Sequence, residues 1–467
     1  GYWPIPFNNG RLIIDSSSDT LIQEVRKMTF YGTQGNICDA NGNFLMSSNG
    51  VWIANANNDT MMNGAGINPG PYVANWPNGL VFSYANLFLP HPADSSHFIL
   101  LHQTGNTNGP IMPSELFYSV IDMTLDSGLG AVTSKNQTIL QDTISWGIGA
   151  CKHANGRDWW IHVMKDSSSQ VYSSLLTPSG FEQPVIFNLG FSPIPIENGS
   201  QITFSPDGTK FITTTYDNPV DRNSYLALSF FDRCTGSFGL IQAIPIPTQG
   251  YIWGIAFSPS GKYVYVAQSN FIYQIDTDNL TLTLVATYDG YISPGPSCCA
   301  TTFSNLYLAA NGKIYITSGS GVQHLSVINY PDSAGTACDV QQHSIDLVNY
   351  LHLRAVPNHP NYNLGPVIGS ACDSLALGIS ENDHDFKLNV FPNPSHGSFQ
   401  FTYSLPSNEK GILTLFNVTG TKVFEQVLPP WSTIQSIQLP DHVSDGVYGI
   451  SISSGVHRAT KKLILLR

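Results

Sequence analysis

Charged residues are scarce in this sequence. Asp, Glu, Lys and Arg make up 11% of the 467 residues, against about 25% in an average soluble domain. The 20 basic residues are outnumbered by 32 acidic ones, so the formal net charge is −12. No basic stripe interleaved with aromatic residues is present, which excludes the common nucleic-acid-binding classes. An anionic membrane surface would also repel a chain of this charge.

Long apolar runs and paired metal-binding cysteines are missing as well. No stretch reaches the ~18 uninterrupted apolar residues of a transmembrane helix, so we expect no transmembrane segment. None of the seven cysteines lies in a C-x-x-C pair, which disfavours a zinc ribbon. Their odd number leaves at least one thiol free or paired outside the chain, and one or two disulfides are expected in an exported protein. The opening GYWPIPF has no methionine, which suits a mature protein whose signal peptide has been removed.

Asn, Ser, Thr, Gly and Pro replace the missing charge, and this composition favours strands and turns. A strand–turn–strand unit recurs, clearest as ITFSPDGTKFITTTY at 202–216 and IAFSPSGKYVYVAQ at 255–268. In both units proline presets φ at the second turn position, and glycine accepts a positive φ near the end of the turn. The flanking runs alternate apolar and polar residues, as half-buried strands do. Related units lie at 37–50, 87–103, 150–164 and 303–319.

A further strand pair follows each unit, for example at 270–288. Four strands every ~45–65 residues, repeated along the chain, are the pattern of a β-propeller. Residues 10–30 look like the outer half of a blade, and residues 351–358 look like an inner strand without its outer half. We therefore predict an all-β fold in which residues 1–372 form a seven-bladed propeller closed by both chain ends. Six blades are the alternative.

Four segments of this region resemble those of a known family. They are KHANGRDWW at 152–160, FSPDG at 204–208, FDRCTG at 231–236 and PNHPNYNLGP at 357–366. Together they make the chain similar to secreted β-propeller proteins of Bacteroidota, over roughly residues 20–373. The resemblance implies the propeller architecture. It carries over no catalytic residue, because none is assigned in that family.

A polar, acidic linker at 373–386 precedes a second predicted domain at 387–467. Its short strands, about seven in about 80 residues, fit an immunoglobulin-like β-sandwich. This domain resembles the C-terminal sorting domain of type IX secretion cargo. The resemblance implies recognition by the type IX secretion machinery and export across both membranes, to the cell surface or the extracellular space. The matching motif residues are Pro392, Asn393, Pro394, Gly397, Gly420, Gly446, Tyr448, Lys461 and Lys462.

Few residues suggest a ligand. The oxygen side chains of 39–43 are spaced as in calcium loops but lack the later bidentate glutamate, so we prefer a plain turn and predict no cofactor; Ca²⁺ is the alternative. Trp76 lies in a loop and could stack on a sugar ring. Asp followed by Ser or Thr and a small or aliphatic residue resembles the Bacteroidota O-glycosylation motif. This motif places candidate glycosylation sites at Thr20, Thr60, Thr143, Ser333 and Ser374.

Two functions of different classes follow. The preferred one is a non-catalytic exported protein that acts as an assembly or adhesion subunit, or as a binding platform. Its partners would be other surface proteins, copies of itself, or glycans. The alternative is a secreted enzyme acting on polysaccharide or peptide at a propeller face, which requires convergent carboxylates or a metal there. The sequence contains no G-x-S-x-G elbow and no P-loop, which favours the non-catalytic function.

Overall fold

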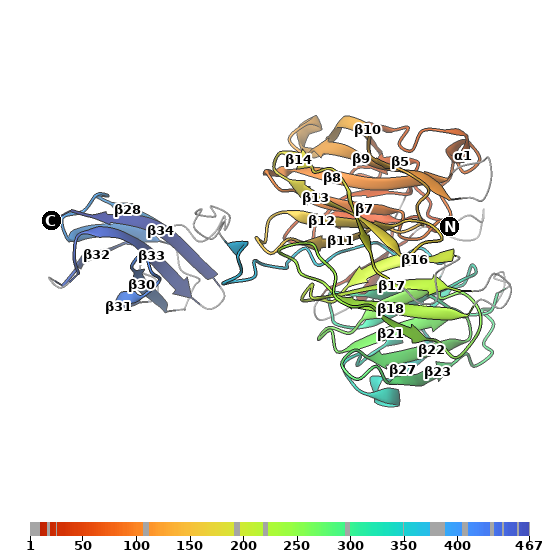
Figure 1. Cartoon of the computed structure of the whole chain (residues 1–467). Coiled ribbons are helices and arrows are strands. Elements are labelled where there is room, and N and C mark those ends of the chain that lie inside the picture. Colours follow the sequence, from red (N-terminus) through yellow and green to blue (C-terminus); the bar gives the residue numbers. More distant parts are fainter. Residues whose placement is uncertain are drawn as a thin grey trace. The chain divides into compact units, whose positions relative to one another are not determined.

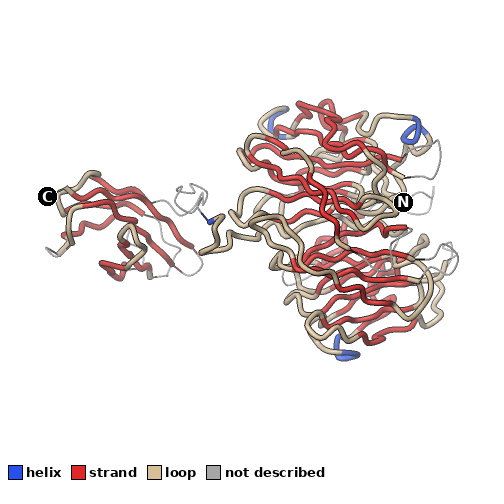
Figure 2. Tube along the Cα trace, viewed as in Figure 1, coloured by secondary structure: helices blue, strands red, loops and turns tan. Residues whose placement is uncertain are grey.

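The protein is described by a computed structural model that covers residues 10–15, 19–24, 26–105, 112–190, 197–217, 223–294, 299–348, 350–373, 388–403, 410–429, 434–440, 443–454 and 457–466. The chain divides into two compact units, Gly1–Cys372 and Asp373–Arg467. Both units are built of strands (Figure 1; Figure 2). The described helices are short: α1 (Pro71–Ala74) and the 3₁₀ turns η1 (Asp126–Gly128) and η2 (Gly335–Cys338). None of these helices could cross a membrane.

The first unit contains consecutive groups of antiparallel strands, which we number sheets 1 to 6 in chain order. Sheets 1 and 2 comprise β3 (Gly35–Cys38), β4 (Phe44–Ser48), β5 (Trp52–Ala54), β6 (Thr60–Ala65); β7 (Asn86–His91), β8 (Asp94–Gly105), β9 (Pro113–Asp122), β10 (Ala131–Gln141). These two sheets are joined by the parallel pairing of β6 with β10. Sheets 3 and 4 comprise β11 (Gly149–Lys152), β12 (Trp159–Met164), β13 (Gln170–Thr177), β14 (Gly180–Phe181), β15 (Val185–Asn188); β16 (Glu197–Phe204), β17 (Lys210–Tyr216), β18 (Ser224–Phe230), β19 (Gln242–Pro245). Sheets 5 and 6 comprise β20 (Gly254–Phe257), β21 (Tyr263–Gln268), β22 (Phe271–Asp276), β23 (Leu282–Thr287); β24 (Phe303–Leu308), β25 (Ile314–Ser318), β26 (His324–Ile328), β27 (Val340–Asp346).

The predicted hairpin turns share one geometry, and it explains the recurring sequence unit. In the S-P-D-G turn, the amide of Gly208 donates to the carbonyl of Ser205 over 2.8 Å, and Gly208 has φ +73°. The turn at Gly261 repeats this arrangement, with a 2.9 Å bond and the same φ. A side chain at this position would be strained, so glycine follows from the turn itself. The repeated unit is therefore a hairpin between the first two strands of a sheet.

The sheets pack face to face around inner strands, as in a β-propeller. The first strand of each sheet lies beside the first strand of another, with β3 beside β7, β11 beside β16, and β20 beside β16 and β24. Apolar clusters fill the spaces between successive sheets, for example between sheets 3 and 4 and between sheets 5 and 6. The largest fully buried side chains there include Trp159, Phe211, Tyr265 and Phe303. The predicted all-β propeller fold is thus confirmed.

The two chain segments predicted to form a seventh blade do not pair with each other. Strands β1 (Gly10–Ile14) and β2 (Asp19–Gln23) form a two-stranded hairpin. His352 makes only an isolated bridge to Val322, in the loop between β25 and β26. Sheets 1 to 6 each contain four or five of the described strands, and a seventh blade closed by both chain ends stays a prediction. Ala355 and Val356 of this segment are buried, and the backbone of Arg354 bonds to Asn305 in β24 and to Thr317 in β25.

The β1–β2 hairpin still lies where an additional blade would lie. Leu12 and Ile14 pack on the buried face of sheet 6. On the other side, the guanidinium of Arg11 lies 4.5 Å from the ring centroid of Phe44 in sheet 1. The hairpin thus contacts both neighbouring sheets and covers their facing surfaces with two strands.

The second unit is a β-sandwich of two antiparallel sheets, as predicted. One sheet has the order β28 (Leu388–Phe391), β29 (Ser398–Tyr403), β32 (Ile434–Gln438). The other has the order β31 (Lys422–Leu428), β30 (Gly411–Phe416), β33 (Gly446–Ser454), β34 (His457–Leu465). Alternate residues of β29, Phe399, Phe401 and Tyr403, are buried in one core with residues of β30, β33 and β34. The predicted linker 373–386, apart from Asp373, lies outside the described residues.

Candidate functional site

Residues 354–367, which we call the central segment, run along the inner strands of the first unit. The side-chain amide of Asn358 donates to backbone carbonyls just before β7 and just before β11, over 3.1 and 2.8 Å. His359 has one ring nitrogen 2.9 Å from the carbonyl of Asn36 in β3 and the other 2.8 Å from the hydroxyl of Tyr307 in β24. Two adjacent residues therefore bond to the starts of four sheets.

Farther along, the central segment continues toward the other end of the inner strands. The hydroxyl of Tyr362 donates to the carbonyl of Phe88 in β7, over 2.8 Å, and its ring meets Trp159 edge-on. Asn361 donates to the carbonyl of Pro206, which follows β16, over 2.7 Å. A cavity of about 50 Å³ remains beside the segment, lined by β7, β11 and β16. The space between the inner strands is thus occupied by the chain's own residues.

The segment leaves the inner strands at a cluster that we call the exit junction, built around Arg233. This side chain is buried, and its guanidinium donates only to backbone carbonyls. Nε donates to Lys152 over 2.8 Å, while Nη2 donates to His153 over 3.2 Å and to Gly365 over 2.6 Å. Burial lowers the pKa of Arg233, but a guanidinium stays protonated in a protein. The guanidinium of Arg233 therefore links the end of the central segment to the end of β11 and the loop that follows it through hydrogen bonds.

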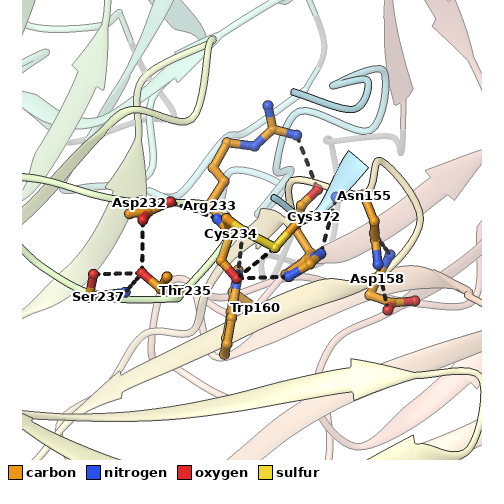
Figure 3. Close-up of a disulfide and its surroundings, with 10 residues drawn as sticks. Asn155, Asp158, Trp160, Asp232, Arg233, Cys234, Thr235, Ser237 and Cys372 are labelled. Atoms are coloured by element: carbon orange, nitrogen blue, oxygen red, sulfur yellow. Dashed lines mark hydrogen bonds between the residues drawn. A yellow bond between two sulfur atoms is a disulfide. The ribbon is translucent and has the colours of Figure 1, made fainter. Parts of the chain in front are cut away.

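A disulfide fixes the chain directly beyond this point. Cys234 and Cys372 are bonded, with their Cα atoms 5.6 Å apart and a sequence separation of 138 (Figure 3). The carbonyl of Arg233 accepts the indole N–H of Trp160 over 2.8 Å. The ring of Trp160 in turn lies against Gly236, where an added Cβ would come within 2.7 Å of it. The packing leaves no room for a side chain at that glycine.

The exit junction brings together the segments that carried the family resemblance. KHANGRDWW and FDRCTG meet at Arg233, and the end of PNHPNYNLGP is held by the same side chain. FSPDG joins through its Gly208, where an added Cβ would lie 2.8 Å from side-chain atoms of Arg233 and of Leu364. Cys234 is oxidised, and Arg233 donates three hydrogen bonds to backbone carbonyls, so this arrangement is suited to anchoring the chain. The sequence singled out these segments but did not indicate that they touch.

In the sandwich, Asn393 joins the two ends of the domain. Its side-chain amide donates to the carbonyl of Lys462 over 2.6 Å, and its oxygen accepts the amide of Ile464 over 2.9 Å. The neighbouring Ser395 bonds through its own amide to the carbonyl of Ile464, over 2.8 Å. The P-N-P turn thus adds backbone-like bonds to the outer edge of β34.

The remaining motif residues lie at turns and on β34. Gly420 has φ +78° in a turn capped by Asn417, and Gly397 has φ +90°. Gly446, with φ +155°, begins β33. The hydroxyl of Tyr448 donates back to the carbonyl of Ser444 over 2.7 Å, as in the tyrosine corner of immunoglobulin-like domains. Pro392 and Pro394 flank Asn393 in the turn. Lys461 is half-buried and Lys462 is exposed.

The other sequence candidates are scattered over the first unit. Thr20, Thr60 and Thr143 are exposed and Ser333 is half-buried, while Ser374 lies outside the described residues. Trp76 is half-buried and meets Tyr31 edge-on, with ring centroids 5.8 Å apart. In the 39–43 turn, both carboxylate oxygens of Asp39 accept hydrogen bonds from within the turn. No group of three His, Cys, Asp or Glu side chains in the described ranges is arranged to hold a metal ion.

Comparison with known proteins identifies the second unit. Residues 389–466 match the family of secretion system C-terminal sorting domains. The predicted type IX sorting domain is therefore confirmed, and it marks the chain as a secreted Bacteroidota protein exported to the cell surface or extracellular space. No curated protein matches the chain.

Solved structures show a more general likeness. PorZ of Porphyromonas gingivalis, described as an essential surface component of the type IX secretion system, is 11% identical with a TM-score of 0.30, over 98% of this chain and 70% of PorZ. A quinonprotein alcohol dehydrogenase-like protein of Bacteroides thetaiotaomicron is 12% identical with a TM-score of 0.35, over 72% of this chain and 70% of the other. The extracellular domain of a two-component system protein from B. thetaiotaomicron is 9% identical, with a TM-score of 0.31; this chain spans 60% of its length. Such values do not assign a role.

Proposed function

Because residues 389–466 form a sorting domain, we propose that the exported protein works through its outer surfaces, as a non-catalytic assembly or adhesion subunit. The observation that carries this proposal is the central segment. Propeller sites for substrates or metals are commonly built where the inner strands converge, and here that space holds the chain's own residues 354–367. Asn358, His359 and Tyr362 use their polar atoms to bond to inner strands, so they are engaged in structure.

The outer edges of the sheets are the surfaces that could bind another chain. The outer strands of sheets 1 and 2, β6 and β10, pair with each other in parallel through Met62 and Ala131, so these two edges are covered. Sheet 3 instead ends in β15, which among the described strands pairs with β13 alone. Its Val185 and Ile186 are each 51% exposed, and the strand VIFN has no charge. Exposed, uncharged edge strands pair with strands of other chains.

We therefore place the contact between copies, or with a partner protein, at β15. The second unit offers a matching edge in β31, whose partner within the described part of the sandwich is β30 alone and which exposes 61% of Val427. A contact between β15 of one copy and β31 of another would be heterologous. Repeated, such a contact generates rings or open filaments.

Light scattering and electron microscopy of the purified protein test this proposal. We expect concentration-dependent association that is abolished by Ile186→Lys, because a charge at the edge opposes strand pairing. Leu240→Lys is the matched control: Leu240 is 87% exposed in a loop outside the sheets. Association that survives Ile186→Lys would contradict the role of β15. A monomer that hydrolyses a polysaccharide or peptide would favour the enzyme instead.

A further inference from the structure

Arg354 lies at one mouth of the ring, which we define as the end where the inner strands begin. Its carbonyl accepts a hydrogen bond from Asn305 in β24, and its guanidinium lies over Trp253, directly before β20. Asn305 also donates to Ser83, just before β7. The side chain is half-buried, and its guanidinium carbon lies 5.3 Å from the ring centroid of Trp253. The central segment begins here, so this mouth is the end opposite to the exit junction.

The guanidinium of Arg354 differs from that of every other arginine in the described ranges, because it has no hydrogen bond or ion pair. The others bind carboxylates, carbonyls or a hydroxyl: Arg11, Arg26, Arg157, Arg233 and Arg458. Burial lowers the pKa of Arg354, and no carboxylate nearby opposes that effect. A half-buried cation without an anion loses solvation and gains no charge partner in return. Its five donors remain available to a ligand.

The backbone of Arg354 is held in a strained conformation. Arg354 has φ +27°, and the amide of Ala355 bonds to the carbonyl of Leu353 in a tight three-residue turn. Such a conformation is strained for a residue with a side chain and persists only when its surroundings fix it. Here the carbonyl of Arg354 accepts from Asn305 over 2.8 Å and from Thr317 over 3.1 Å. Strain of this kind gathers at functional sites.

The surroundings of the guanidinium suit a sugar that carries an acid. Tyr251 lies beside Trp253, with ring centroids 5.6 Å apart, and offers aromatic surface. Ser269, which accepts the Trp253 indole N–H over 3.1 Å, is exposed and supplies a hydroxyl group. A planar guanidinium binds a carboxylate through two parallel hydrogen bonds. The flat face of an aromatic ring offers apolar surface on which the apolar face of a sugar ring can pack.

We propose that this mouth binds an acidic saccharide, with Arg354 holding the carboxylate of a uronic acid. The site is separate from the β15 edge, so it stands whether or not copies of the chain associate. It also requires no catalytic group.

Isothermal titration calorimetry of the full chain with trigalacturonate tests the site. We expect 1:1 binding that weakens about tenfold or more in Arg354→Gln, because a charge-assisted bidentate contact is lost. Arg458→Gln is the matched control, since Arg458 also lies over an aromatic ring, 5.9 Å from that of Phe416 in the sandwich. It should leave the affinity unchanged. If Arg354→Gln does not fold, Arg354→Lys keeps the charge and the stem and should still weaken binding, because it lacks the planar fork.

Two further ligands separate the acid from the sugar. Maltotriose is neutral and a triglutamate peptide is acidic but not a saccharide, and both should bind at least about tenfold more weakly. Absence of trigalacturonate binding, or binding that Arg354→Gln leaves intact, would overturn the proposal. Equal or tighter binding of the peptide would assign the site to acidic peptides, and equal binding of maltotriose would remove the role of the carboxylate.

Discussion

Removing the Cys234–Cys372 disulfide should destabilise the first unit without unfolding the second. The bond closes a loop with a sequence separation of 138 residues. In the chain-entropy account, opening a loop of this length costs about 5 kcal/mol, and measured effects range from about 2 to 5 kcal/mol. The entropy of unfolding for a unit of this size is about 0.8 kcal/mol/K. We therefore expect the double variant Cys234→Ser, Cys372→Ser to lower the melting temperature of the first unit by about 3–6 °C.

Differential scanning calorimetry of the full chain measures this shift, because each unit has its own core and should give its own transition. Cys38→Ser is the matched control, since Cys38 is a free, exposed thiol. Variants are preferable to a reductant, because Cys299 is also disulfide-bonded. An unchanged first-unit transition in the double variant would refute the reasoning. It would mean that Arg233 and the central segment hold the exit junction without the bond.

Three further substitutions probe the packing, the charge and the sorting domain. Gly236→Ala should lower the melting temperature of the first unit more than Gly290→Ala does. Both glycines have a positive φ, but only Gly236 packs against a ring, that of Trp160. Equal decreases would show that the backbone conformation, and not the contact with Trp160, determines the loss of stability. Burial alone would raise the pKa of Glu24, but hydrogen bonds from two arginines and an asparagine lower it to about 2. A lowered carboxyl pKa stabilises the fold above the unfolded value of 4.5, and this contribution is lost as the pH falls toward 2. The melting-temperature gap between the natural protein and Glu24→Gln should therefore be largest at neutral pH and close between about pH 5 and pH 2; a constant gap would contradict this. Asn393→Ala removes two hydrogen bonds within the sandwich, so it should lower the melting temperature of the second unit and reduce surface delivery in a secretion assay, whereas unchanged melting would place its role outside stability.

The local features of the fold could be predicted from the sequence because each lies within a few residues. The turns at Gly208 and Gly261 follow from one proline and one glycine, and alternating side chains identify the strands around them. The P-N-P turn at 392–394 was recognisable for the same reason. Its bonds to β34 were not, because about seventy residues separate them.

Contacts between residues far apart in the chain could not be predicted, because they produce no periodic pattern in the sequence. Asn358 and His359 bond to backbone carbonyls more than two hundred residues away, and such bonds require no particular residue at the other end. Residues 351–358 resemble an inner strand in sequence, whereas in the structure His352 forms an isolated bridge to Val322. The pairing of Cys234 with Cys372 could not be chosen among seven cysteines, since sequence does not show which thiols meet.

The late position of the central segment in the chain also limits when, during synthesis, the first unit can complete its fold. Asn358 and His359 bond to parts of the chain that were made 210 and 323 residues earlier. Contacts of such high sequence separation form slowly, because the loop must close before they are gained. A ring assembled from the earlier sheets alone would lack the central segment between its inner strands until about residue 366 had been synthesised. The first unit can therefore complete its fold only when synthesis has reached the residues that precede the sorting domain.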